Sequence, residues 1–189
     1  MNLKVIEKIN LLTNNKLIIW LNIWALVIFL GLVLVGIYAM GEFEIFPKEE
    51  KTLLFILYMV LRVLLFCCSF IVLLVLHELI HGLFFKVFKP ESKVKFGFKN
   101  GMAYAASPGS IYPRIPFFII IIMPFIIISA LLSIISLFGI DSTFLYLLFA
   151  CHTSGCVGDF YYCYLLTRKK GKIYIEDTEV GIDIYEETA

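Results

Sequence analysis

An apolar stretch from Thr52 to Phe88 constrains the fold of this chain more than any other feature of its sequence. As one helix the stretch would be ~55 Å long, whereas the hydrocarbon core of a bilayer is ~30 Å thick. In a membrane it must therefore be tilted or divided. Arg62 and Lys86 bound its most apolar part, so residues 63–85 are the predicted buried span. The Arg62 side chain is expected to reach the membrane interface.

The rest of the chain shares this apolar character. Hydrophobic residues make up 61% of the sequence and the mean hydropathy is +0.93, far above the values of soluble domains. We predict an all-α polytopic membrane protein in which residues 1–189 form a single membrane domain. Its four transmembrane helices are expected at about residues 17–40, 63–85, 115–138 and 143–167. The lysine-bearing segment before residue 17 is expected to lie along the membrane surface.

Basic residues gather on one side of this predicted arrangement. With four spans, the N-terminal segment, the loop of residues 86–114 and the segment after residue 167 share a side, and most Lys and Arg residues lie there. The other side has Lys48 and Lys51. The positive-inside rule therefore predicts a multi-pass protein of the cell membrane with both termini in the cytoplasm. The formal net charge of +1 does not indicate a nucleic-acid partner, and none is expected. The five cysteines fall in apolar runs, so no disulfide framework is expected.

Two imidazoles and a carboxylate interrupt the second apolar run, in the order His77-Glu78-Leu79-Ile80-His81. On a helix, residues four apart lie on one face, so His77 and His81 can bind one metal ion while Glu78 projects beside it. This is the pattern of zinc metalloproteases, in which the acid acts as general base. An unpaired carboxylate in hydrocarbon is costly, which argues against a pair of core histidines and a stray acid.

A catalytic zinc ion needs a third protein ligand, and the last apolar run contains three candidates. Asp159, the only acid in that run, is expected at nearly the same depth below the cytoplasmic surface as the histidine motif. His152 and Cys156 would lie deeper unless the helices tilt or unwind, and they remain alternative ligands or groups that support the ligands. We therefore predict zinc bound by His77, His81 and Asp159.

Two short segments outside the spans have hairpin patterns. The segments 93–98 and 102–106 flank Lys99-Asn100-Gly101, and Asn-Gly is a strong hairpin signal. This hairpin, in the loop between the second and third spans, could offer a strand edge to an unwound substrate, or it could be a structural loop. Its candidate substrate-binding residues are Phe96, Gly97, Phe98, Asn100, Gly101, Met102, Ala103 and Tyr104. Residues 173–186 alternate around Gly181 and predict a small cytoplasmic tail hairpin, whose use the sequence leaves open.

The motif His77-Glu78-x-x-His81 together with Asp159 resembles the site-two protease clan of intramembrane zinc metalloproteases, and more closely the small bacterial putative zincin peptidase family. The resemblance covers about residues 53–166. The chain departs from the better-known members of the clan at Gly158-Asp159. In those members the glycine follows the aspartate, and Asn-Pro often precedes the aspartate. The resemblance also implies a strand-rich loop that guides substrate between the two metal-bearing parts.

These observations predict a zinc-dependent intramembrane metalloprotease. Its expected substrate is a membrane protein or a peptide presented at the lipid bilayer, with Zn²⁺ as cofactor and Glu78 as general base. Two other classes of protein use the same features: a membrane zinc carrier or sensor would bind the ion without hydrolysis, and a non-catalytic scaffold would hold a partner. Transport favours several intramembrane acids along a path, whereas the deep acids predicted here are Glu78 and Asp159.

Overall fold

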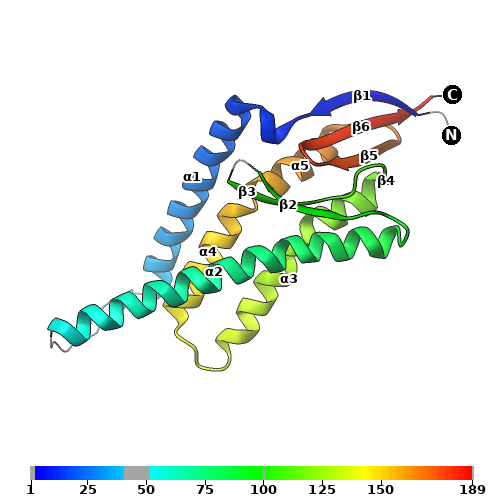
Figure 1. Cartoon of the computed structure of the whole chain (residues 1–189). Helices are drawn as coiled ribbons and strands as arrows, with labels where there is room; N and C mark the ends of the chain where they lie inside the picture. Colours follow the sequence, from blue (N-terminus) through cyan, green and yellow to red (C-terminus); the bar gives the residue numbers. More distant parts are fainter. Residues whose placement is uncertain (1–2, 41–51, 100, 189) are drawn as a thin grey trace.

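The computed structural model describes residues 3–40, 52–99 and 101–188, and Figure 1 shows their arrangement. Five α-helices, one 3₁₀ turn and six strands form the described part of the chain. The helices are α1 (Asn15–Met40), α2 (Thr52–Phe88), α3 (Arg114–Ser136), α4 (Ser142–Gly155) and α5 (Val157–Arg168), and the 3₁₀ turn is Leu11–Thr13. The strands are β1 (Leu3–Ile9), β2 (Lys95–Lys99), β3 (Met102–Ala106), β4 (Ile111–Pro113), β5 (Ile173–Thr178) and β6 (Gly181–Glu187).

Three of the described helices, α1, α2 and α3, are long and apolar enough to cross a membrane. Only 6% of the most apolar window of α1 and of α2 is buried inside the protein, and 28% of that of α3. Apolar side chains that face outward in such numbers would be unfavourable in water but suit a lipid surface. The structure is thus compatible with a multi-pass membrane protein.

The prediction of a fourth spanning helix at residues 143–167 is not confirmed, because that segment forms two shorter helices. Helix α4 has 14 residues and α5 has 12, and Cys156 separates them. The Cys156 amide donates to both the His152 carbonyl, at 3.1 Å, and the Thr153 carbonyl, at 3.2 Å, which tightens the last turn of α4. The hydropathy of the segment did not indicate this interruption.

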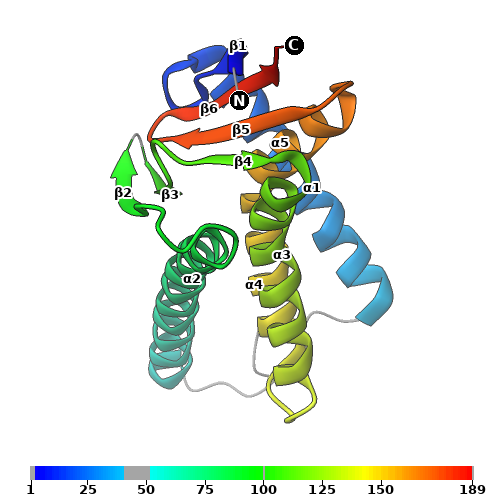
Figure 2. The same cartoon turned by 90° about the vertical axis from the view of Figure 1, so that its right-hand side faces the viewer.

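Helix α2 is continuous over 37 residues, so the second apolar run is not divided. The Arg62 side chain forms an ion pair with Asp141 and donates to the Tyr58 hydroxyl, and the Asp141 side chain also caps the N-terminus of α4. The expected place of Arg62 at the membrane interface stays a prediction. Tyr146 of α4 donates a hydrogen bond to the Leu32 carbonyl of α1 at 2.7 Å. These contacts attach α2 and α1 to α4 on the side away from the sheet (Figure 2).

The predicted tail hairpin is present as β5 and β6, within a larger antiparallel sheet of order β1-β6-β5-β4. Residues 3–9 of the N-terminal segment pair with β6 as β1; their expected location along the membrane surface stays a prediction. Pairing satisfies the backbone donors and acceptors on the facing edges of the two strands, with β1 at the edge of the sheet. This sheet lies across one end of α3 and α5, with both chain ends close together beyond it (Figures 1 and 2).

The main core lies between this sheet and the helix ends. Tyr112 of β4 packs among apolar side chains from the inner face of the sheet and from three helices. The buried members of this core are Ile9, Phe85, Tyr112, Phe117, Ile120, Ile121, Cys163, Leu166, Ile173, Ile175, Ile182 and Ile184. The sheet therefore closes the end of the helical bundle where the histidine motif lies.

The second predicted hairpin is also present: β2 and β3 pair antiparallel, with Lys99 opposite Met102. Gly101 has φ +81°, a conformation that favours glycine in a tight turn. Asn100 lies outside the described residues. A Cβ on Gly82 of α2 would lie 2.5 Å from the Phe96 ring, so the hairpin packs closely on α2 beside the histidine motif.

Candidate metal centre

The two histidines of the motif converge as the helical spacing predicts. His77 and His81 lie on one face of α2, and their Nε2 atoms are 3.1 Å apart. His81 is buried, and its Nδ1 lies 3.0 Å from the Ile120 carbonyl of α3. Because a carbonyl only accepts, Nδ1 carries the proton of His81 and Nε2 presents a lone pair.

Asp159 reaches the same point from the first turn of α5. Its Oδ2 is 3.2 Å from His77 Nε2, and its Oδ1 is 3.5 Å from His81 Nε2. The carboxylate is 19% exposed and the two imidazoles are 12% and 10% exposed, so all three groups are largely removed from solvent. The structure therefore brings together the three ligands proposed from the sequence.

The donor atoms fit a divalent ion. If His77 donates from Nδ1 to His152 and His81 donates from Nδ1 to Ile120, two imidazole lone pairs and a carboxylate face one another with no proton between them. A divalent ion among them would pair with all three acceptors. Tetrahedral donors at zinc bond lengths are about 3.3 Å apart, close to the 3.1, 3.2 and 3.5 Å seen here. The set of two nitrogens and one oxygen is typical of catalytic zinc, which keeps a fourth position open.

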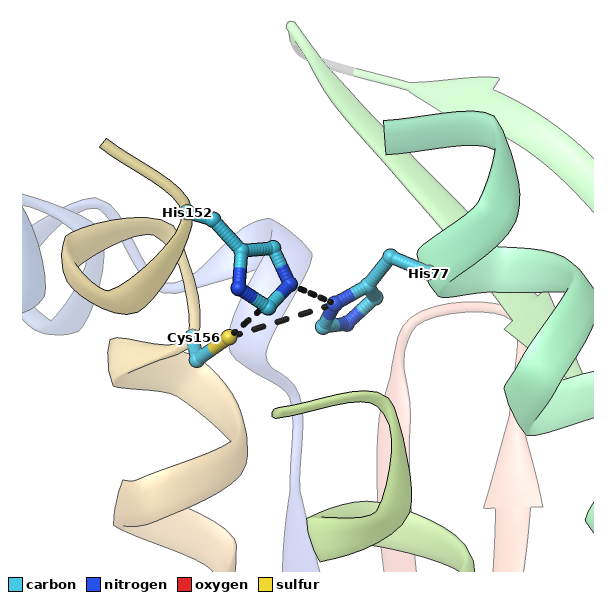
Figure 3. A group of neighbouring side chains, drawn as sticks. All are labelled: His77, His152 and Cys156. Carbon is cyan, nitrogen blue, oxygen red and sulfur yellow. Dashed lines mark hydrogen bonds between the residues drawn. The ribbon is translucent and has the colours of Figure 1, made fainter. Parts of the chain in front are cut away.

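The alternative ligands lie at His77 Nδ1, whereas His81 and Asp159 lie at Nε2; Figure 3 shows His77 with His152 and Cys156. His152 Nε2 is 3.2 Å from His77 Nδ1, and Cys156 Sγ is 3.9 Å from the same nitrogen. Both side chains are buried, with exposures of 2% and 1%. They were expected to lie deeper than Asp159 unless the last helix unwinds, and the break at Cys156 is such an interruption.

Glu78 is half-buried and faces the β2–β3 hairpin, where the backbone amide of Ala105 lies against its carboxylate. Within the described residues, β3 pairs with β2 alone, so its other edge is free of strand partners. Tyr104 covers Gly97 on this hairpin, since a Cβ on Gly97 would lie 2.5 Å from its ring. The other described residues of the predicted substrate hairpin are Phe96 and Phe98, which are exposed, Met102 and Ala103, which are half-buried, and Gly101 in the turn.

The sequence reasoning missed one carboxylate near this centre, Asp177 of β5. Alternation along β5 places it on the same face as Ile173 and Ile175, which are buried in the core. Burial raises the pKa of Asp177 well above its usual range; the nearby His81 opposes the shift and the Asp159 charge adds to it. Its backbone pairs with β6, but no hydrogen bond or ion pair of the Asp177 carboxylate is found among the residues that the structure describes. The signal available in the sequence was the alternation of Ile173, Ile175 and Asp177, which places an acid on the apolar face of a predicted strand.

The helical scaffold and this donor set define a candidate metallopeptidase centre of the kind built on a His-Glu-x-x-His helix. Residues 70–174 match the family described as putative zincin peptidase, which covers more than half of the chain. The chain belongs to this family. Membership indicates a zinc-dependent peptidase. Neither a curated protein nor a solved structure matches the chain.

Proposed function

We propose that this protein is an intramembrane zinc metalloprotease of the site-two protease type, which hydrolyses peptide bonds of membrane-embedded or membrane-presented substrates. The observation that carries the proposal is the meeting of His77, His81 and Asp159 from two helices at hydrogen-bond distances, beside Glu78. Family membership supports the peptidase chemistry. The long apolar surfaces of α1 and α2 support a location in the bilayer.

Each side chain of the centre has a separate role in the proposed hydrolysis. His77, His81 and Asp159 would hold the zinc ion, and the Ile120 carbonyl fixes the ring of His81. When bound, zinc supplies Lewis acidity, which lowers the pKa of a water molecule and polarises the scissile carbonyl. The Glu78 carboxylate accepts a proton from the attacking water and passes it to the leaving amine.

The β2–β3 hairpin provides an edge for the substrate. A peptide bond in a membrane helix is already hydrogen-bonded along its backbone, so the substrate must unwind before hydrolysis. The free edge of β3 offers main-chain donors and acceptors to such an extended segment. Because the Ala105 amide lies at Glu78, a segment paired with β3 would pass beside the general base.

The distribution of basic residues supports one orientation of the protein in the membrane. The sheet containing β1 and the tail hairpin lies at the end of the bundle where Lys8, Arg114 and Lys169 also lie. The positive-inside rule assigns this end, with both termini, to the cytoplasm of a multi-pass cell-membrane protein. Substrate and lipid bilayer are the expected partners, and nucleic acid is not.

A Glu78→Gln variant tests the function. The purified protein in detergent is compared with wild type for zinc content by mass spectrometry and for hydrolysis of a peptide library and of a liposome-embedded helix. We expect the variant to retain zinc and lose hydrolysis, because an amide cannot accept the proton. Glu91→Gln, a change at an exposed loop residue, serves as the matched control and should retain both. Equal hydrolysis by the Glu78→Gln variant would refute the assignment of the base.

A further inference from the structure

We propose that His77, His152 and Cys156 form a second cation site, which takes Zn²⁺ or a similar thiophilic divalent ion and shares the His77 ring with the first site. The proposal concerns metal binding alone and does not depend on the peptidase activity. It begins from the two ring nitrogens of His77, because Nε2 faces His81 and Asp159 whereas Nδ1 faces His152 and Cys156. One imidazole thus presents a nitrogen to each of two groups of ligand atoms.

The distances in the second group agree with coordination. A tetrahedral ion bound at normal Zn–N and Zn–S lengths holds two nitrogens about 3.3 Å apart and nitrogen and sulfur about 3.6 Å apart. The observed separations are 3.2 Å for the two nitrogens, and 3.7 and 3.9 Å from Cys156 Sγ to His152 and His77. The three side chains need little movement to close around an ion (Figure 3).

The local sequence presets this arrangement. His152 lies in the last turn of α4, and Cys156, four residues on, caps its C-terminus with its amide bonded to the His152 carbonyl, so the two side chains lie on one side of the helix end. Imidazole and thiolate are donors that zinc and other thiophilic ions prefer over harder cations. Both side chains are almost fully buried, which holds them in place before an ion arrives.

The ligand atoms of the second group already contact one another. His77 Nδ1 and His152 Nε2 share a hydrogen bond, and the Cys156 sulfur lies 3.9 and 3.7 Å from these two nitrogens. An ion in the second group uses all three donors. Binding requires loss of the His77 Nδ1 proton and the Cys156 thiol proton, and both pass to solvent.

Sharing one ring couples the two sites. With both ions present His77 becomes a bridging imidazolate, and the two cations repel each other across the ring. The second ion therefore binds more weakly than the first. This order separates the two sites in a titration.

Cobalt(II) titration of the zinc-free protein in detergent tests the proposal, because thiolate-bound Co²⁺ gives a strong near-ultraviolet charge-transfer band that nitrogen and oxygen ligands do not give. We expect two equivalents, with the band growing during the second. Cys156→Ser should remove the band and the second equivalent while keeping the first, which also shows that the variant is folded. Cys151→Ser, a change in the adjacent helix turn, is the matched control and should keep both.

Three results would overturn the second site: a single equivalent without the band, a band that survives in the Cys156→Ser variant, or a single equivalent that carries the band. The last would mean that the ion uses this group in place of His81 and Asp159. Asp159→Ala distinguishes the two proposals, because it should abolish the first equivalent and leave the thiolate band. Failure of the peptidase proposal alone would leave both equivalents of cobalt in wild type.

Discussion

Replacing His152 by alanine is expected to weaken zinc binding at a site that His152 does not itself coordinate. His152 Nε2 lies 3.2 Å from His77 Nδ1, and when His77 Nε2 binds zinc, Nδ1 carries the ring proton and donates a hydrogen bond to His152, which fixes the ring with Nε2 toward His81 and Asp159. Removing a partner of this kind usually costs 10- to 100-fold in metal affinity, or about 1.4 to 2.8 kcal/mol. Because His81 keeps its Ile120 partner, the effect should not reach complete loss of zinc.

The assay is competition with a chromophoric chelator, with zinc below one equivalent so that only the tighter site fills. Thr153→Ala is the matched control, since Thr153 is a buried neighbour on the same helix whose hydroxyl has no hydrogen-bond partner in the described structure. We expect its zinc affinity to equal that of wild type. His152→Gln, whose amide oxygen can accept the His77 proton, should recover part of the loss. An unchanged affinity in His152→Ala would refute the role of this hydrogen bond.

Three further changes test other parts of the structure. A buried acid with a raised pKa stabilises the fold only while it is protonated, so stability falls as the pH rises above its unfolded pKa of about 3.9. Asp177→Asn should therefore raise the unfolding temperature of the zinc-free protein at pH 7 and have no effect near pH 3; an equal gain at both pH values would exclude titration as the cause. Gly181→Ala places a Cβ 1.9 Å from the Ile9 carbonyl oxygen, at a residue with φ +155°. The change should detach β1 from β6 and lower the unfolding temperature by several degrees. An unchanged unfolding temperature would argue against the pairing of β1 with β6. Gly82→Val should displace Phe96 and reduce hydrolysis at least several-fold with zinc content unchanged; wild-type hydrolysis would count against the hairpin as the substrate edge.

Local sequence patterns predicted the parts of the structure that depend on neighbouring residues. The spacing of His77 and His81 places both rings on one helix face, and Asn-Gly between alternating segments indicated the β2–β3 hairpin. A depth comparison singled out Asp159, and the structure places it beside both histidines. Each of these inferences uses either a helical period, a turn preference or the length of a helix.

The features that were missed depend on contacts between distant segments. Pairing of β1 with β6 joins the two ends of the chain, and no local pattern in residues 3–9 distinguishes a strand from a surface segment. The break at Cys156 lies within an apolar run, where hydropathy has no signal for it. Asp177 lies near the metal centre because the sheet packs against the helix ends, and this contact between distant segments has no local signal in the sequence.

The central claim is that one zinc ion is held by two imidazoles and a carboxylate, and X-ray absorption at one equivalent of zinc tests it most directly. The account predicts scattering from two histidine rings and only nitrogen and oxygen neighbours at about 2.0 to 2.2 Å. In Asp159→Ala this signal should be lost, and zinc that still binds should show the sulfur neighbour of the second group. A sulfur neighbour at about 2.3 Å in the wild type at that stoichiometry would contradict the account.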